Sequence, residues 1–209
     1  MSILLKIDVS SRGDLSISRK LSSLFVEQWR QVHAGGKIIE RDIATTNLPF
    51  LEFPWIAANL AKASTRTAEQ VTLLALSDAL VAELQQADEY LIATPMYNFG
   101  IPAKLKAYVD HIVRGGLTFK TNADGSYTGL LKGKKATVII ASAGEYTSGA
   151  PAEGFDTLTP YLREILGYIG VTEVIFIQSG STWKVDGGLE NADEHIAPLK
   201  YQITAAASA

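Results

Sequence analysis

Apolar runs and helical repeats alternate along the whole chain. Runs rich in Ile and Val, without polar alternation, indicate strands that are covered on both faces. Five such runs occur, at residues 3–9, 38–43, 89–93, 136–141 and 173–177. Between them, apolar residues recur at helical spacing in residues 21–32, 73–84, 105–112 and 161–169. The alternation predicts a doubly wound, five-stranded parallel sheet with right-handed crossovers and helices on both faces.

One segment does not fit this alternation. Residues 45–67, "TTNLPFLEFPWIAANLAKASTRT", follow neither period and carry two prolines beside Phe50, Phe53 and Trp55. We expect a long loop, and a loop of this length in a compact domain usually covers a site or an interface. Two interpretations stay open: the aromatic rings cap the core of their own subunit, or they form an exposed patch used for association.

Composition narrows the class of protein. A chain of 209 residues can bury the core of one α/β domain, so we expect a single domain over residues 1–209. Hydrophobic residues make up 47% and charged residues 20%, which is typical of a globular protein. A net charge of −3 provides no basic face for nucleic acid. The chain has no cysteine, so any redox role requires a cofactor.

Targeting and metal signals are also missing. The first apolar run is interrupted by Lys6 and Asp8, and no later run reaches the length of a membrane span. We therefore expect neither a signal peptide nor a membrane segment. The expected location is the cytoplasm. His33, His111 and His195 share no metal-ligand spacing, so no metal site is expected.

Three loops are candidates for a binding site, because ligands of open parallel sheets bind beyond the carboxyl ends of the strands. They are residues 10–18 after the first strand, 94–100 after the third and 142–149 after the fourth. The first, "SSRGDLSIS", has no G-x-G-x-x-G, so a dinucleotide pyrophosphate is not expected. Hydroxyls of Ser10, Ser16 and Ser18, with the free N–H groups of a helix start, suit a monophosphate dianion without any fixed positive side chain. Alternatively, Ser16 or Ser18 only caps the helix.

The sequence contains neither a P-loop nor the nucleophile motif of serine hydrolases. "GLLKGKK" at residues 129–135 has three residues between glycines where a P-loop has four, and it ends in Lys135 where Ser or Thr is needed. No G-x-S-x-G is present, so nothing supports Ser142 as a nucleophile. ATP binding and serine hydrolase chemistry are therefore not expected.

The stretch "PMYNFG", residues 95–100, is the most specific in the chain. It places a thioether, a phenol, an amide and a phenyl ring together at the mouth of the sheet. Such a lining suits a planar ring with polar edges, which Met96 and Tyr97 would flank. The alternative is a buried turn plugged by aromatic side chains.

Four segments together resemble the FMN-dependent NADH azoreductase and quinone reductase family. They are "VSSRGDLSISRKL", "PMYNFGIPAKLKAYVDHIVRGGLTF", "GLLKGKKATVIIAS" and "YLREILGYIGV", in that order along the chain. The resemblance implies a flavodoxin-like sheet with strand order 2-1-3-4-5 and a homodimer that holds two FMN. It also implies reduction of quinones and azo compounds by NADH or NADPH, with hydride transfer through flavin N5 and no essential catalytic side chain.

The resemblance also implies which residues contact the cofactor and substrate. It implies that the FMN phosphate contacts Ser10, Ser16, Ile17 and Ser18. The isoalloxazine would lie beside Pro95, Met96, Tyr97, Asn98 and Phe99, and the third loop would contact FMN through Ser142, Ala143, Gly144 and Glu145. The substrate pocket falls on Asn98 and Phe99 with Phe119, Tyr127 and Tyr168, and the last three are candidates for a wall that the partner subunit supplies.

The third loop departs from the family's usual S-R-G-G, because Ala143 replaces arginine and Glu145 replaces the second glycine. We therefore expect an altered charge beside the flavin. A further departure is Thr121, where many members carry an aromatic residue. Two rival functions stay open: a one-electron carrier of flavodoxin type, and a regulatory protein that kept the fold and lost the flavin.

Overall fold

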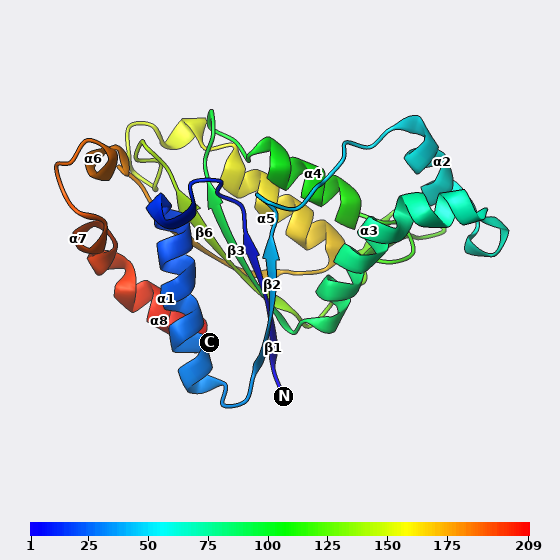
Figure 1. Cartoon of the computed structure of the whole chain (residues 1–209), viewed down its shortest axis with the longest axis horizontal. Coiled ribbons are helices and arrows are strands. Elements are labelled where there is room, and N and C mark those ends of the chain that lie inside the picture. Colours follow the sequence, from blue (N-terminus) through cyan, green and yellow to red (C-terminus); the bar gives the residue numbers. More distant parts are fainter.

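Five parallel strands form the centre of the computed structural model, which describes residues 1–209 (Figure 1). The strand order is β2-β1-β3-β6-β7, which confirms the predicted flavodoxin-like order 2-1-3-4-5. The central strand β3 is buried along its whole length, as its unbroken apolar run predicts. The strand bounds are β1 Ile3–Asp8, β2 Lys37–Asp42, β3 Glu89–Pro95, β6 Lys135–Ala141 and β7 Glu173–Ser179.

Helices cover both faces of this sheet, as predicted (Figure 1). One face carries α1 (Ile17–Val32), α7 (Ala192–Ile196) and α8 (Lys200–Ala207). The other face carries α3 (Ala68–Gln86), α4 (Ala103–Ile112) and α5 (Leu158–Ile169). Short helical turns complete the chain: η1 (Gly13–Leu15), η2 (Ala63–Thr65), η3 (Glu153–Phe155), α6 (Trp183–Asp186) and η4 (Ala197–Leu199). None of the helices combines the length and the apolarity that crossing a bilayer requires.

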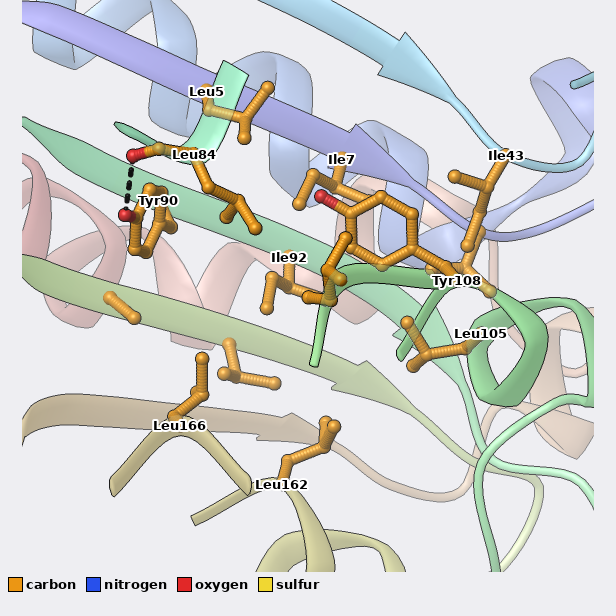
Figure 2. Packing of buried hydrophobic residues seen from close by; sticks show 14 of the residues in the cluster. Leu5, Ile7, Ile43, Leu84, Tyr90, Ile92, Leu105, Tyr108, Leu162 and Leu166 are labelled. Atoms are coloured by element: carbon orange, nitrogen blue, oxygen red, sulfur yellow. Dashed lines mark hydrogen bonds between the residues drawn. The ribbon is translucent and has the colours of Figure 1, made fainter. Parts of the chain in front are cut away.

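The larger core lies between the sheet and α3, α4 and α5 (Figure 2). Leu5 of β1 and Ile92 of β3 point into it and pack with Leu84 of α3 and Tyr108 of α4. The hydroxyl of Tyr90 donates a hydrogen bond of 2.7 Å to the Leu84 carbonyl oxygen, and burial raises the pKa of this phenol. Burial of each such large apolar side chain contributes about 1.5–3 kcal/mol. This packing fixes the strands whose carboxyl ends carry the candidate site loops.

Residues 45–67 do not form the loop that the sequence predicts. They contain α2 (Phe53–Leu60), which begins with a proline in its first turn, where the missing N–H costs nothing. Trp55 is only 7% exposed and packs with Ala58 against Leu74 of α3, whereas Phe53 is 79% exposed. Trp55 therefore fills the core of its own subunit. The expectation was wrong because a helix of two turns shows too few repeats to reveal its period.

A small hairpin also escaped the sequence pattern. Strands β4 (Phe119–Thr121) and β5 (Tyr127–Gly129) pair antiparallel around the turn that contains Gly125, whose φ is +83°. A Cβ on Gly129 would lie 2.1 Å from the backbone nitrogen of Gly170, so only glycine permits this contact with the end of α5. The hairpin therefore sits at the end of α5 that is remote from the carboxyl ends of the strands.

Candidate functional site

The three predicted loops meet at the carboxyl ends of β1, β3 and β6, around a pocket of about 190 Å³. Each loop contributes to it, together with residues that come from α6 near the C-terminus. The lining residues are Ser10, Arg12, Ser16, Ile17, Pro95, Met96, Tyr97, Ala141, Ala143, Thr182 and Asp186.

The first loop presents unpaired donors at the start of α1. Ser16 is the N-cap, and its Oγ accepts a hydrogen bond of 3.3 Å from the Arg19 N–H, so the capping interpretation holds for this serine. Ser18 lies behind it, fully buried, with its Oγ 3.1 Å from the Ser16 Oγ. The backbone N–H groups of Ile17 and Ser18 have no acceptor. Free N–H groups at a helix start attract anions, and this end of α1 opens on the pocket.

The second loop is a tight turn held in an unusual conformation. Tyr97 and Gly100 exchange two backbone hydrogen bonds of 3.0 Å, and Asn98 and Phe99 between them have φ of +47° and +69°. Left-handed conformations at both central positions define a type I′ turn, which normally prefers Asn-Gly. Phe99 is therefore strained, at a cost on the order of 1–3 kcal/mol. Tyr97 and Phe99 are each 45% exposed, so the turn is not the buried plug considered as an alternative.

Contacts from the start of α5 hold this turn. The Phe99 carbonyl oxygen accepts hydrogen bonds from the Thr157 N–H at 3.0 Å and from the Thr157 hydroxyl at 2.7 Å. The Phe99 ring stacks on Phe155 with centroids 5.2 Å apart and meets Tyr146 edge-on at 6.1 Å. The strained residue is thus fixed through both its backbone and its side chain.

We expect Thr157→Val to lower the free energy of unfolding by about 1 kcal/mol, because the Phe99 carbonyl loses one of its two donors. Urea denaturation followed by circular dichroism measures this change. Thr65→Val is the matched control, because the hydroxyl of Thr65 donates to a carbonyl at an exposed site remote from the turn. Equal unfolding energies for the two variants would show that the hydroxyl does not support the turn.

The third loop contributes less side-chain surface than predicted. Ala143 lines the pocket, whereas Ser142 is buried and its hydroxyl donates to the Gly144 carbonyl oxygen at 2.9 Å. Glu145 is exposed and accepts a hydrogen bond of 2.6 Å from the Thr147 hydroxyl. Its carboxylate lies against Gly180, where a Cβ would come within 2.3 Å of it. Ser142, Gly144 and Glu145 therefore lie beside the pocket rather than in its lining.

The structure adds four lining residues that the sequence did not reveal, namely Arg12, Ala141, Thr182 and Asp186. Arg12 donates two hydrogen bonds to Asp186, at 2.6 and 3.1 Å. This pairing raises the pKa of Arg12 and lowers that of Asp186. The pocket therefore carries a positive side chain that the serine pattern alone did not predict. Arg12 belongs to the first candidate loop, but nothing in the local pattern predicts a partner 174 residues away.

The aromatic residues of the predicted substrate pocket do not come together in one subunit. Phe119, Tyr127 and Tyr168 pack on each other, with ring centroids 4.7–6.0 Å apart. They lie at the C-terminal end of α5, whereas Phe99 contacts Thr157 at its beginning. Twelve helical residues separate these ends by about 18 Å. Within one subunit the three rings therefore do not share a pocket with Asn98 and Phe99.

One further hydrogen-bonded set resembles the arrangement of serine hydrolases. His195 has its Nε2 3.1 Å from the Ser179 Oγ and its Nδ1 2.5 Å from a Glu190 carboxylate oxygen. Ser179 is only 2% exposed, however, so a substrate has no access to its hydroxyl. The set instead ties α7 to the end of β7, and the other two histidines, His33 and His111, lie elsewhere in the fold.

Comparison with known proteins agrees with this architecture. Residues 2–203 match a family model described as a flavodoxin-like fold. The chain is 44% identical over 207 residues to FMN-dependent NADH:quinone oxidoreductase 2 of Jannaschia sp., covering 99% of this chain and 100% of that protein. It is 41% identical to FMN-dependent NADH:quinone oxidoreductase of Acidobacterium capsulatum, covering 97% and 98% of the two chains.

A solved structure gives the same result in three dimensions. The azoreductase from Bacillus anthracis str. Sterne superimposes with a TM-score of 0.86 at 25% identity, covering 100% of this chain and 99% of that one. The matches cover nearly the whole chain. The chain therefore belongs to the flavodoxin-like family of FMN-dependent NADH:quinone oxidoreductases.

Proposed function

We propose that this protein is an FMN-dependent NADH oxidoreductase that reduces quinones and azo compounds by two electrons. The observation that carries the proposal is the pairing of free N–H donors at the start of α1 with an apolar, aromatic loop across one pocket. A phosphate needs the first feature and a flavin ring needs the second. The names of the relatives, FMN-dependent NADH:quinone oxidoreductases, support the same assignment.

The pocket residues fit FMN group by group. The hydroxyls of Ser10 and Ser16, with that of Ser18 behind Ser16, and the N–H groups of Ile17 and Ser18 would hold the phosphate. Pro95, Met96 and Tyr97 line the pocket and would flank the isoalloxazine, with Asn98 and Phe99 next to them in the turn but outside the lining. The third loop would approach the ring edge through Ala143, with Ser142, Gly144 and Glu145 beside it. FMN, when bound, supplies the hydride-accepting chemistry at N5. The protein's own task is to hold the ring, fix its orientation and leave one face open to the nicotinamide and then to the acceptor.

A visible spectrum of the purified protein with stoichiometric FMN, followed by anaerobic NADH, tests the proposal. Bleaching of the flavin absorbance, and its return on addition of a quinone or an azo dye, is the expected result. NADPH in a parallel titration compares the two donors. A stable long-wavelength absorbance of a one-electron form would favour the carrier. Failure to bind FMN would favour the flavin-free regulatory protein.

We also propose that the working unit is a homodimer. The outer face of α2 exposes Phe53, Ile56 and Leu60 at helical spacing, and Phe50 is exposed beside it. This face lies on the opposite side of α2 from the buried Trp55 and Ala58, and no other part of the chain covers it. A two-fold axis lets one copy cover the same patch on another, which is the commonest symmetry of soluble oligomers.

We expect Glu145→Gly to raise the midpoint potential of the bound flavin by roughly 10–30 mV, because a nearby carboxylate disfavours added negative charge on the ring. Spectroelectrochemical titration of the FMN-loaded proteins measures the potential. Glu145→Gln removes only the charge and should give most of the same rise. Identical potentials in all three proteins would place the carboxylate in solvent, beyond electrostatic reach of the flavin.

A further inference from the structure

An ion pair closes one side of the pocket. Arg12, in the loop after β1, forms a bidentate pair with Asp186 at the end of α6. They are the only charged residues among those that line the pocket. Both side chains are nearly half exposed, so the pair itself contributes little to the stability of the fold. Its position on the pocket, rather than its strength, requires an explanation.

Asp186 is held firmly where it faces Arg12. The N–H of Thr182 donates to the Ser142 carbonyl oxygen at 3.0 Å, and the N–H of Ser181 donates to the Gly144 carbonyl oxygen at 3.2 Å. The α6 turn is thereby attached to the third loop of the site. Beyond α6, the Glu190–His195–Ser179 set fastens the following segment to β7. The carboxylate is therefore a fixed charge, whereas Arg12 reaches it through a long and flexible side chain.

The charges of the pocket decide how an anion is received. Arg12 and Ser10 belong to the same short loop, and the Arg12 N–H donates to the Ser10 Oγ at 3.3 Å. A phosphate dianion beside Ser10 and Ser16 would attract the guanidinium and repel the carboxylate. When both side chains are present, their charges cancel. Asp186 alone would repel the phosphate, and Arg12 alone would attract it. The two residues therefore act on the phosphate with opposite sign.

We propose that Arg12 binds the FMN phosphate and that Asp186 competes with the phosphate for the Arg12 guanidinium, which sets the affinity for the cofactor. This inference rests on the proposed function. Before FMN binds, Arg12 pairs with Asp186. When FMN binds, the guanidinium donates some or all of its hydrogen bonds to the phosphate, because a dianion is a stronger acceptor than a carboxylate.

A purely mechanical role of the same ion pair leads to a different expectation. If the pair served only to fasten α6 over the pocket, removing either partner would weaken flavin binding to the same extent. Riboflavin, which has the same ring but no phosphate, would then be affected as much as FMN. Competition for the guanidinium instead predicts opposite effects of the two substitutions, confined to the ligand that carries a phosphate.

The test is a double-mutant cycle on the full-length protein, with dissociation constants of FMN and riboflavin measured by quenching of flavin fluorescence at low ionic strength. We expect Arg12→Gln to weaken FMN binding roughly 10- to 100-fold. Asp186→Asn should tighten it roughly 3- to 10-fold. The double variant should bind FMN more tightly than Arg12→Gln alone, and Arg12→Lys should retain most of the wild-type affinity. Riboflavin affinity should change less than about twofold throughout.

Matched controls remove a charge of the same kind away from the pocket. The controls are Arg163→Gln and Asp193→Asn. Arg163 lies on α5 with its guanidinium over the Phe176 ring, and Asp193 lies on α7. Neither should change either dissociation constant. Weaker FMN binding by Asp186→Asn, or equal effects on FMN and riboflavin, would overturn the competition while leaving the proposed function intact. A wild-type protein that binds no FMN would overturn both.

Discussion

Replacing Ser16 and Ser18 together by alanine is expected to weaken FMN binding by about two to four powers of ten while the protein stays folded. Each hydroxyl that bonds a charged phosphate contributes roughly 1.5–3 kcal/mol, and the two hydroxyls lie 3.1 Å apart at the free N–H groups of α1. Because Ser18 lies behind Ser16, it acts either directly or by orienting the Ser16 hydroxyl. Flavin fluorescence titration measures the affinity, and a water molecule that replaces a hydroxyl would reduce the loss.

The capping role of Ser16 requires its own control. Loss of this cap costs about 1 kcal/mol of helix stability, whereas glycine at the same position costs only a few tenths. Ser16→Gly with Ser18→Ala therefore removes the same hydroxyls with less damage to α1. Ser22→Ala, on the same helix, removes a buried hydroxyl that has no hydrogen-bond partner and should leave both stability and affinity unchanged. Wild-type FMN affinity in the first two variants would limit these serines to capping.

The sheet and the location of the candidate site follow directly from local sequence patterns. Each central strand, such as β3, is a short apolar run whose periodicity and flanking helices leave few topologies open. The site loops follow from a rule of the fold, because they come after β1, β3 and β6. The segment from Ser10 to Ser18 indicates a binding loop because three serines before a helix exceed what capping alone needs.

The features that the sequence did not reveal depend on contacts between distant residues. Asp186 meets Arg12 only because β7 returns the chain to the same edge of the sheet. The left-handed φ of Phe99 is imposed by Thr157 and Phe155, since phenylalanine alone does not favour that conformation. Helix α8 buries Ala206 and Ala207 against α1, and alanine gives almost no hydrophobic periodicity. In each case tertiary contacts outweigh local preference.

Charged replacements on the exposed face of α2 are expected to convert a dimer to a monomer. Phe53→Asp with Leu60→Asp places two carboxylates on the patch that would be buried between copies, and neither side chain is packed within its own subunit. Trp55 is not suitable for this test, because it is buried beside His111 and Arg114 and its loss would destabilise the fold by about 3–5 kcal/mol. Sedimentation velocity at micromolar concentration measures the assembly state. Tyr201→Asp, at an equally exposed site on α8, is the matched control.

The same variant should bind FMN and yet turn over its acceptor more slowly. The residues proposed to contact the phosphate and the ring belong to one chain, so we expect these contacts to survive dissociation. Phe119, Tyr127 and Tyr168 lie at the far end of α5, a helix about 18 Å long, from the turn at Asn98 and Phe99. In the proposed dimer they would wall the acceptor site across the two-fold axis. Dissociation would open that wall and expose the flavin to water. A wild-type protein that sediments as a monomer with full quinone reductase activity would refute the dimer, because the pocket of one subunit would then be complete without these rings.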